Sequence, residues 1–349
     1  MTSEAVVSVS KKAKNVDVTK LEYLSNELLM ELLEYIDLYN LCRSFYNQNF
    51  RLNALIDNRS VKYRTNLSTS KKFSYFCCMM RNKYNRIISL TVSGDSCIPR
   101  FTASTVLDEL VALRSLTLNE ITTKQLELIV RKLTRLHQLV FINVTLTQYF
   151  FSLDIHHACR LLLYDIPSLK SAVIDSGTNV IVKISESLLN ISNLDTLTFA
   201  GCQSNVFDFI PLVRQMPKLR SLNISLHQNL ISFGVLLNTS SFMHFNLVRL
   251  NLKIFNLSFD HLCETLKIVP NVKQLSIGGC IRDPIFLTSE RWKQLLLHGS
   301  LSKLVEFMVS IQMSIADVPN NDEFRSDPYL NQRKFKFDNG YLSAQYKKR

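Results

Sequence analysis

One short pattern of apolar residues recurs along most of the chain and limits what it can fold into. An apolar residue is followed by further apolar residues three and five positions later, and the spacing starts nine times, at Ile87, Leu113, Leu136, Leu169, Leu194, Leu219, Leu247, Val272 and Leu304. The steps between these starts average about 27 residues. A unit of this length cannot bury its apolar face alone, so the units must stack in a row.

Each unit also contains a segment with the periodicity of a helix. Apolar residues recur at helical spacing in residues 124–133, 206–215 and 259–269. A strand at the start of each unit would therefore alternate with a helix. The sequence predicts an α/β fold in which a curved solenoid covers residues 87–315.

The residues between the apolar positions of each strand predict a binding surface. Side chains alternate between the two faces of a strand, so these residues should line the concave face of the solenoid. Arg249 and Lys253 would give that face a basic spot suited to an acidic or phosphorylated protein segment. For any single position, the alternative is a solvated polar side chain. The candidate substrate-binding residues are Gln138, Asn223, Arg249, Asn251, Lys253 and Gln274.

A different pattern, typical of three short helices, occupies residues 21–60. Ser25 can cap the first helix, whose broad apolar face is made by Leu28, Leu29, Leu32, Leu33 and Ile36. Two further helices follow, around Leu41 and around Leu52. So small a bundle cannot shield three apolar faces by itself. A partner or the rest of the chain must cover part of it.

The first of these helices resembles the F-box. Residues 24–37, Leu-Ser-Asn-Glu-Leu-Leu-Met-Glu-Leu-Leu-Glu-Tyr-Ile-Asp, are similar to the family's opening Leu-Pro, Glu-Leu-Leu, Ile-Leu and Tyr-Leu-Asp, with Ser25 in place of Pro. The similarity continues to Phe50, where the family often has Trp. An unrelated amphipathic bundle is the alternative. The resemblance implies a surface for a Skp-type adaptor, formed or supported by Leu24, Leu28, Leu29, Leu32, Leu33, Ile36, Leu41 and Phe45.

The repeated units resemble leucine-rich repeats, and two of them carry Cys202 and Cys280 in the cysteine slot of that motif. Such repeats often follow an F-box, and the two resemblances together cover residues 21–315. They imply the substrate-recognition subunit of a Skp–cullin–F-box ubiquitin ligase. Its expected partners are a Skp-type adaptor, through it a cullin–RING ligase, and a protein substrate of unknown identity.

Signatures of catalysis and of metal or cofactor binding were not found in the sequence. It has no GxSxG, HExxH, Walker or GxGxxG motif, and its eight cysteines form no CxxC pair. The adjacent His156 and His157 have no acidic or cysteine partner at ligand spacing. We therefore expect a non-catalytic protein without cofactor or metal.

Positive charge keeps a second class of function open. The net charge is +12, and eight Lys or Arg residues lie between Asp57 and Asp95, so residues 61–86 are predicted to form a basic linker. Such a segment could bind nucleic acid or an acidic partner, or the repeats could act as a scaffold outside a ligase. No nucleic-acid-binding module accompanies the charge, so nucleic acid is not an expected partner.

The two ends of the chain are predicted from composition. Residues 1–20 are polar, lack the features of a secretory signal, and are expected to be a disordered tail. No apolar run approaches the roughly 20 residues that a membrane crossing needs, so no membrane partner is expected and the location would be cytoplasmic or nuclear. Residues 316–349 are predicted to cap the last repeat and end in a basic tail.

Overall fold

The structure, a computed structural model, describes residues 21–80, 83–147, 154–181, 191–205, 209–227, 246–298, 301, 303–313, 336–338 and 341–347. Over these residues the fold is mixed α/β, as the sequence predicts, and its strands form one twelve-stranded sheet. The predicted N-terminal tail, residues 1–20, lies outside the described residues. Within them, no helix is both long and apolar enough to cross a membrane.

The strands follow one another along the sheet almost in chain order. They are β1 (Tyr63–Leu67), β2 (Ile87–Ser93), β3 (Ser115–Ile121), β4 (Phe141–Leu146), β5 (Ser171–Ile181), β6 (Thr196–Asn205), β7 (Ser221–His227), β8 (Arg249–Phe255), β9 (Gln274–Ile281), β10 (Glu306–Met313), β11 (Lys336–Asp338) and β12 (Tyr341–Lys347). From β1 to β10 each strand pairs in parallel with the next. Beyond β10, β12 and then β11 pair antiparallel and complete the sheet.

Helices precede the sheet and then alternate with its strands. The α-helices are α1 (Asn26–Tyr35), α2 (Leu38–Phe45), α3 (Phe50–Asp57), α4 (Ser70–Met80), α5 (Cys97–Ala103), α6 (Val106–Glu109), α7 (Thr123–Leu133), α8 (Asp154–Tyr164), α9 (Phe209–Arg214), α10 (Phe259–Lys267) and α11 (Ser289–Lys293). Short 3₁₀ turns are η1 (Leu21–Tyr23), η2 (Tyr84–Arg86) and η4 (Pro284–Leu287), and η5 (Gln294–His298) is a π-helical turn. The helices predicted around residues 124–133 and 259–269 are confirmed as α7 and α10. For the one predicted at 206–215, the described part is α9.

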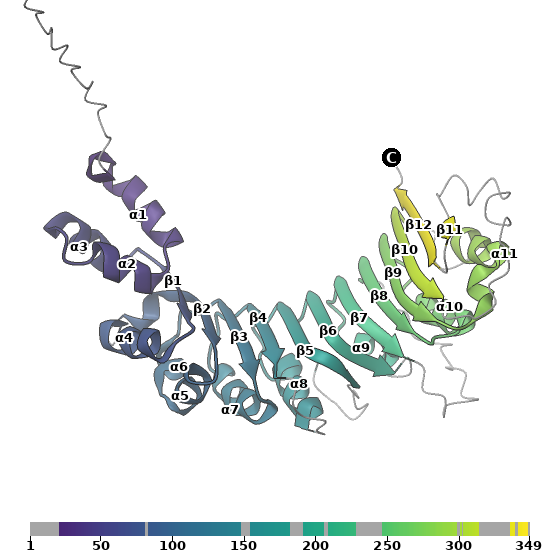
Figure 1. The fold of residues 1–349 in the computed structure, drawn as a ribbon, viewed down its shortest axis with the longest axis horizontal. Coiled ribbons are helices and arrows are strands. Elements are labelled where there is room, and N and C mark those ends of the chain that lie inside the picture. The colour runs from purple at the N-terminus through teal and green to yellow at the C-terminus, as the bar shows by residue number, and fades with distance from the viewer. Residues whose placement is uncertain are drawn as a thin grey trace, which may run out of the picture.

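The sheet is curved, with helices on one side of it (Figure 1). The strands lie side by side along an arc, helices such as α5, α7 and α8 lie on its outer side, and the inner face of the sheet is not covered by helices. In β3, Leu116 and Leu118 are fully buried in the layer between sheet and helices, whereas Ser115 and Thr117 on the open face are partly exposed. Strand alternation therefore separates an apolar core from a polar open face.

The predicted starts of the units match the strands except at one place. β2 begins at the predicted start Ile87 itself, and β3, β5, β6, β7, β8, β9 and β10 each begin two residues after a predicted start. For β4 the start is Leu139 instead of Leu136, because Phe141 pairs with Ser115 and the buried residues are Ile142 and Val144. Leu136 and Leu139 are both followed by apolar residues three and five positions later, and the prediction took Leu136 as the start. Gln138 was therefore wrongly placed on a strand. It is exposed in the turn before β4.

A further regularity is visible only in the backbone. Gly94, Glu120, Gly201 and Gly279 all have positive φ angles, of 87°, 60°, 66° and 124°. Each lies seven positions after the start of its unit, at Ile87, Leu113, Leu194 and Val272. A positive φ thus recurs at the same position of four units, inside β3, β6 and β9 and directly after β2.

The first three helices form a small module with defined ends. The Leu28 N–H donates to Ser25 Oγ over 3.4 Å, which confirms Ser25 as the predicted N-cap of α1. Asp37 Oδ1 caps α2 and Asn49 Oδ1 caps α3. Caps of this kind satisfy amide groups that a helix leaves unbonded at its first turn. The module is therefore made of three separately terminated helices.

Residues 61–86, predicted as a basic linker, are folded into the sheet. β1 alternates buried and exposed residues, with Tyr63, Thr65 and Leu67 buried, and α4 buries Phe73 and Phe76. The prediction was wrong because apolar residues alternate with the cations: Arg64 takes an exposed position of β1, while Lys83 and Arg86 have partners within the chain. The basic segment is an integral first unit of the sheet.

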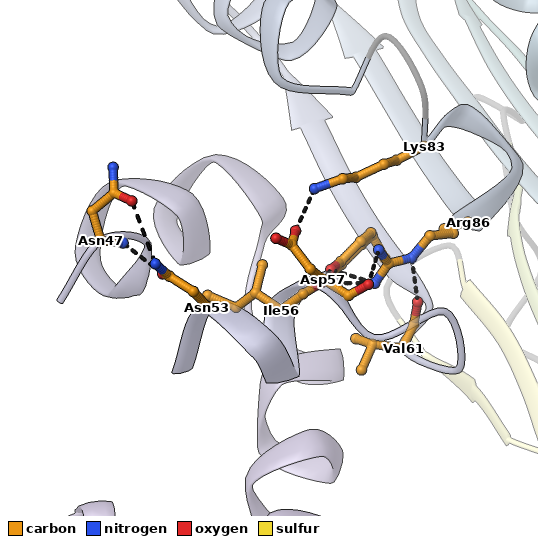
Figure 2. A network of polar contacts seen from close by, with 8 residues as sticks. Asn47, Asn53, Ile56, Asp57, Val61, Lys83 and Arg86 are labelled. Carbon is orange, nitrogen blue, oxygen red and sulfur yellow. Dashed lines mark hydrogen bonds and ion pairs between the residues drawn. The ribbon is translucent and has the colours of Figure 1, made fainter. Parts of the chain in front are cut away.

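Arg86 connects the helical module to the sheet from a buried position (Figure 2). Its guanidinium donates to Val61 O over 3.1 Å, to Ile56 O over 2.8 Å and to Tyr63 Oη over 2.6 Å. The guanidinium carbon also lies 4.6 Å from the centre of the Tyr63 ring. Ile56 belongs to the last turn of α3, where carbonyl groups lack partners and a cation is favoured. One side chain thus binds α3, β1 and the loop between them.

Carboxylates of the helical module also cover the free edge of the sheet. Asp37 Oδ2 accepts from the Asn66 N–H over 2.7 Å, and Glu34 Oε1 accepts from the Lys62 N–H over 3.4 Å. An uncovered edge strand is a template for pairing with other chains. The helices therefore cap the outer edge of β1. At the other end of the parallel strands, β12 pairs with the edge of β10 that faces away from β9.

Candidate functional site

Helix α1 has one face in the core and another exposed to solvent. Leu29 and Leu33 are 1% and 2% exposed, whereas Leu28 and Leu32 are 50% and 44% exposed. Tyr35 continues the exposed row and is 73% exposed. Positions 28, 32 and 35 share one side of a helix because they are spaced by four and three residues. An apolar row therefore runs along the solvent side of α1.

Phe50 adds an aromatic ring to this part of the molecule, at the first position of α3. Its side chain is 89% exposed. The next residue, Arg51, donates to Leu24 O over 2.6 Å and to Asn26 Oδ1 over 2.9 Å, which holds the start of α3 against the start of α1. We call Leu28, Leu32, Tyr35 and Phe50 the helical patch.

Exposed apolar side chains are concentrated in this module. Of the large hydrophobic residues that are exposed in the described parts of the chain, half lie between Leu21 and Phe50. Single exposed apolar residues are normal on a soluble protein, but a group of them marks an interaction surface. The helical patch is therefore the best candidate for a protein-docking surface on the helices.

The eight residues predicted to contact a Skp-type adaptor divide into two groups. Leu28 and Leu32 are exposed and available to a partner. The others are buried or packed against the core, so they can act only by holding the exposed pair in place: Leu24, Leu29, Leu33, Ile36, Leu41 and Phe45. Tyr35 was missed as a site residue, although its position seven residues after Leu28 placed it on the same side of the helix.

A second candidate site is a groove on the open face of the sheet, where it crosses β6 to β10. Its volume is about 440 Å³. Neighbouring strands present hydroxyl, amide and charged groups to it, with Met308 as an exposed apolar side chain. Its polar lining residues are Thr198, Ser221, Asn223, Arg249, Asn251, Gln274, Ser276 and Glu306.

Three groove residues form a row across adjacent strands. Gln274 of β9 is in register with Arg249 of β8 on one side and with Glu306 of β10 on the other. Gln274 Nε2 donates to Glu306 Oε2 over 2.9 Å. Arg249 is exposed and forms no hydrogen bond or ion pair with any residue that the structure describes. The groove therefore offers a ligand two charged groups. One is the guanidinium of Arg249 on β8, and the other is the carboxylate of Glu306 on β10, on the far side of Gln274.

A second row contains only uncharged groups that can form hydrogen bonds. Asn223 and Asn251 are in register on β7 and β8, with Thr198 of β6 and Ser276 of β9 on either side of them. The amide groups of both Asn residues are without hydrogen-bond partners among the described side chains and backbone. Each amide can both donate and accept, so the row can bind a peptide backbone.

Four of the six predicted substrate-binding residues meet in the groove: Asn223, Arg249, Asn251 and Gln274. Lys253 is on β8 and exposed, but it does not line the groove. Gln138 lies outside it, in the turn before β4. The prediction missed Glu306 and Met308, which stand two and four positions after Leu304 and could have been found by applying the strand alternation to the last unit.

Several of the basic residues between Asp57 and Asp95 are committed within the chain. Arg86 is buried in the joint with α3, and Lys83 forms an ion pair with Asp57. Lys72 lies with its Nζ 5.6 Å from the centre of the Tyr39 ring. Cations that are held by the protein contribute less to a surface for phosphates. The described part of this segment therefore does not form a separate basic surface of eight free cations.

The cysteines and other potential ligands do not assemble into a metal site where the structure describes them. No group of three or more His, Cys, Asp or Glu side chains in that part of the chain could hold an ion. Cys202 is buried, and burial raises the pKa of its thiol. Cys280 is partly exposed. Cys202 thus packs inside the core of the solenoid-like array.

Comparison of the sequence with protein families and curated proteins gives no relative from which a function could be transferred. No protein-family model matches the chain, and no curated protein sequence matches it significantly. The function must therefore be argued from the helical patch, the groove and the way in which the fold separates them.

Proposed function

We propose that the chain is a substrate-recognition subunit of a Skp–cullin–F-box ubiquitin ligase, with an F-box in α1 to α3 and a leucine-rich-repeat solenoid in the sheet and its helices. The helical patch would bind a Skp-type adaptor, which links the chain to a cullin–RING ligase. The groove would hold a protein substrate. An adaptor of this kind would act in the cytoplasm or nucleus.

The observation that carries the proposal is the exposed row on α1. Leu28 and Leu32 are about half exposed although the opposite face of the same helix, with Leu29 and Leu33, is buried. Leaving apolar surface in water is unfavourable, by about 25 cal/mol for each Å² that a partner could cover. A helix that is apolar on both faces is accounted for when a partner packs on the second one. The residues concerned are the ones that resemble the F-box.

The sheet supports the second half of the proposal. Nine parallel pairings in continuous sequence, units of similar length and a positive φ at the same position of four units are features expected of a leucine-rich-repeat solenoid. Its open inner face offers hydrogen-bonding groups from consecutive units. Such a surface suits the binding of a protein segment, and no residue of the groove is assigned a chemical step. We propose that the chain is a non-catalytic adaptor.

The proposal is tested by introducing charge into the helical patch. In the double variant Leu28→Asp, Leu32→Asp, two carboxylates would have to be buried against an apolar partner surface without compensation. We expect copurification of a Skp-type subunit with the full chain to fall at least tenfold. The fold should be unaffected, because both side chains are exposed, and circular dichroism checks this.

The matched control places the same charges on exposed apolar residues elsewhere. Leu128 on α7 and Val111 are 54% and 55% exposed, and the double variant Leu128→Asp, Val111→Asp should copurify the Skp-type subunit at the wild-type level. If the α1 variant also does so, the F-box assignment is wrong. The remaining interpretations would then be a repeat scaffold, or a protein that binds nucleic acid or an acidic partner through its basic residues, in either case outside a ligase.

A further inference from the structure

We propose that the groove recognises an extended protein segment carrying an unmodified carboxylate side chain and, about three residues away, a basic side chain. Recognition would then not require phosphorylation of the segment. The inference depends on the proposed function only in calling the segment a substrate. The chemistry of recognition follows from the groove itself.

The positions of the two charged groups define the spacing. Arg249 and Glu306 flank Gln274 on the two neighbouring strands. Strands lie about 4.8 Å apart, so the two backbone positions are separated by about 10 Å. In a polyproline II conformation, residues i and i+3 lie on the same side of the segment about 9 Å apart. A segment with opposite charges three residues apart therefore matches the groove.

The charge balance of the groove favours a carboxylate over a phosphate. Arg249 is the one cation among its lining residues, and Glu306 is the other charged group there. A carboxylate with a single charge can pair with one guanidinium in a bidentate manner. A phosphate carries up to two charges and is usually bound by a cluster of Arg residues. Here it would have one cation and would be repelled by Glu306.

Glu306 can accept a cation from the ligand without losing its present contact. Gln274 donates to one carboxylate oxygen, Oε2. The second oxygen, Oε1, has no hydrogen bond to a described residue. A Lys or Arg of the bound segment can therefore pair with Glu306 while the amide of Gln274 holds the carboxylate in place. In the neighbouring row of the groove, Asn251 lies on the same strand as Arg249 and Asn223 lies one strand before it, so both amides can bond to the peptide backbone on the Arg249 side of the segment.

The test uses peptide libraries that differ only in the arrangement of charge. The immobilised full chain is incubated separately with Asp-X-X-Lys, Lys-X-X-Asp and phosphoserine-X-X-Lys libraries, in which X is any residue except Cys, and the retained peptide is quantified. The first two libraries have the same composition and net charge, so nonspecific electrostatic attraction contributes equally to the retention of both. We expect one order to be retained at least fivefold more than the other, and the phosphoserine library to be retained less than its Asp equivalent.

Exchange of the two charges supplies the decisive variant. In Arg249→Glu, Glu306→Arg the preferred order should invert, because only the direction of the charge pair has changed. Arg249→Gln, a milder change of an exposed side chain, should abolish the preference for either order. Lys253→Gln is the matched control, since this cation is on the same strand but outside the groove, and it should leave the preference unchanged within twofold.

Several outcomes would overturn the inference. Equal retention of the two orders, no retention of any library, a swap variant that keeps the original preference, or stronger binding of phosphoserine would each do so. Copurification with the Skp-type subunit is measured on the same wild-type preparation. If the chain does not copurify with a Skp-type subunit but still prefers one of the two charge orders, the proposed function is refuted. The recognition chemistry of the groove is then still supported.

Discussion

Arg86 is a charged side chain that the fold buries, and backbone carbonyls of three residues surround it. Ile56 and Asp57 belong to the last turn of α3, and Val61 follows in the loop toward β1. Tyr63 accepts from Arg86 and donates its own hydroxyl proton to Ile56 O, and burial raises the pKa of that hydroxyl, so it stays protonated. The guanidinium thus donates four hydrogen bonds to neighbouring oxygen atoms, and a buried cation requires such acceptors.

Replacing this residue should loosen α3 more than the rest of the chain. Arg86→Met keeps the length of the side chain but leaves buried carbonyl groups without donors, at a cost of about 3 kcal/mol. We expect the slowest amides of α3 to exchange with deuterium about 100-fold faster than in the wild type. Hydrogen–deuterium exchange read by mass spectrometry measures this.

Lys83→Met provides the control for that prediction. Lys83 forms an ion pair with Asp57 at the surface, where both side chains are partly exposed, and such pairs contribute about 0–1 kcal/mol. Exchange in α3 should change less than about fivefold. Equal effects of the two substitutions would mean that Arg86 does not connect the helical module to the sheet in the way the contacts indicate.

At single positions, the sequence predicted those features that depend only on neighbouring residues, such as the cap of a helix. Ser25 as an N-cap required only knowledge of which residues cap helices, and the structure has it. The role of Arg86 depends on carbonyl groups from residues 25 to 30 positions away, which no local pattern reveals. Gln138 was misplaced because Leu136 and Leu139 both satisfy the repeat spacing, and only pairing with β3 distinguishes them.

Among the elements, strand β9 holds the glycine that lies closest to a neighbouring backbone of those the structure describes. Gly279 has a φ of 124°, and a Cβ atom there would lie 2.1 Å from Ile254 O of the neighbouring strand. Gly278, directly before it, has a φ that other residues adopt, and a Cβ there would lie 3.4 Å from Ser310 O. Two adjacent glycines thus differ in how much the fold depends on them.

The variants Gly279→Ala and Gly278→Ala should therefore behave differently. The first forces β8 and β9 apart and adds backbone strain of about 1–3 kcal/mol, while the second requires a shift of a few tenths of an ångström at most. We expect the urea midpoint of unfolding to fall clearly only for Gly279→Ala. Trp292, the single tryptophan, provides the fluorescence signal, since it is buried against Phe259 and Phe286 in the same part of the molecule. Midpoints that fall equally would contradict this assignment of strain.

The repeated strands could be predicted because their signal is local and recurs, whereas the first unit could not be recognised in the same way. β1 has the alternation of a strand, Tyr63, Thr65 and Leu67 being buried, but it lies outside the nine starts and among many cations. Its place in the sheet depends on pairing with β2 and on the carboxylates of Asp37 and Glu34. These are tertiary contacts.

Considered as a whole, the molecule holds two different surfaces on separate parts of one chain. The helical patch is apolar and lies before the sheet, while the groove is polar and lies on β6 to β10, toward the other end of the arc (Figure 1). Arg86 connects the helices to the first strands. The arrangement suits an adaptor that holds one protein at each surface. The sequence predicted both regions, but not that Glu306 would share the groove with Arg249, because the last unit was not extended to its intervening residues.

Direct binding to a purified Skp-type subunit tests the central claim. We predict a one-to-one complex with a dissociation constant below about 1 μM, as is typical of a specific interface of standard size. Hydrogen–deuterium exchange on that complex should show protection of α1 and α3 and unchanged exchange in β6 to β10. Absence of a complex at concentrations of tens of micromolar, or protection of the sheet groove in place of the helices, would contradict the proposal.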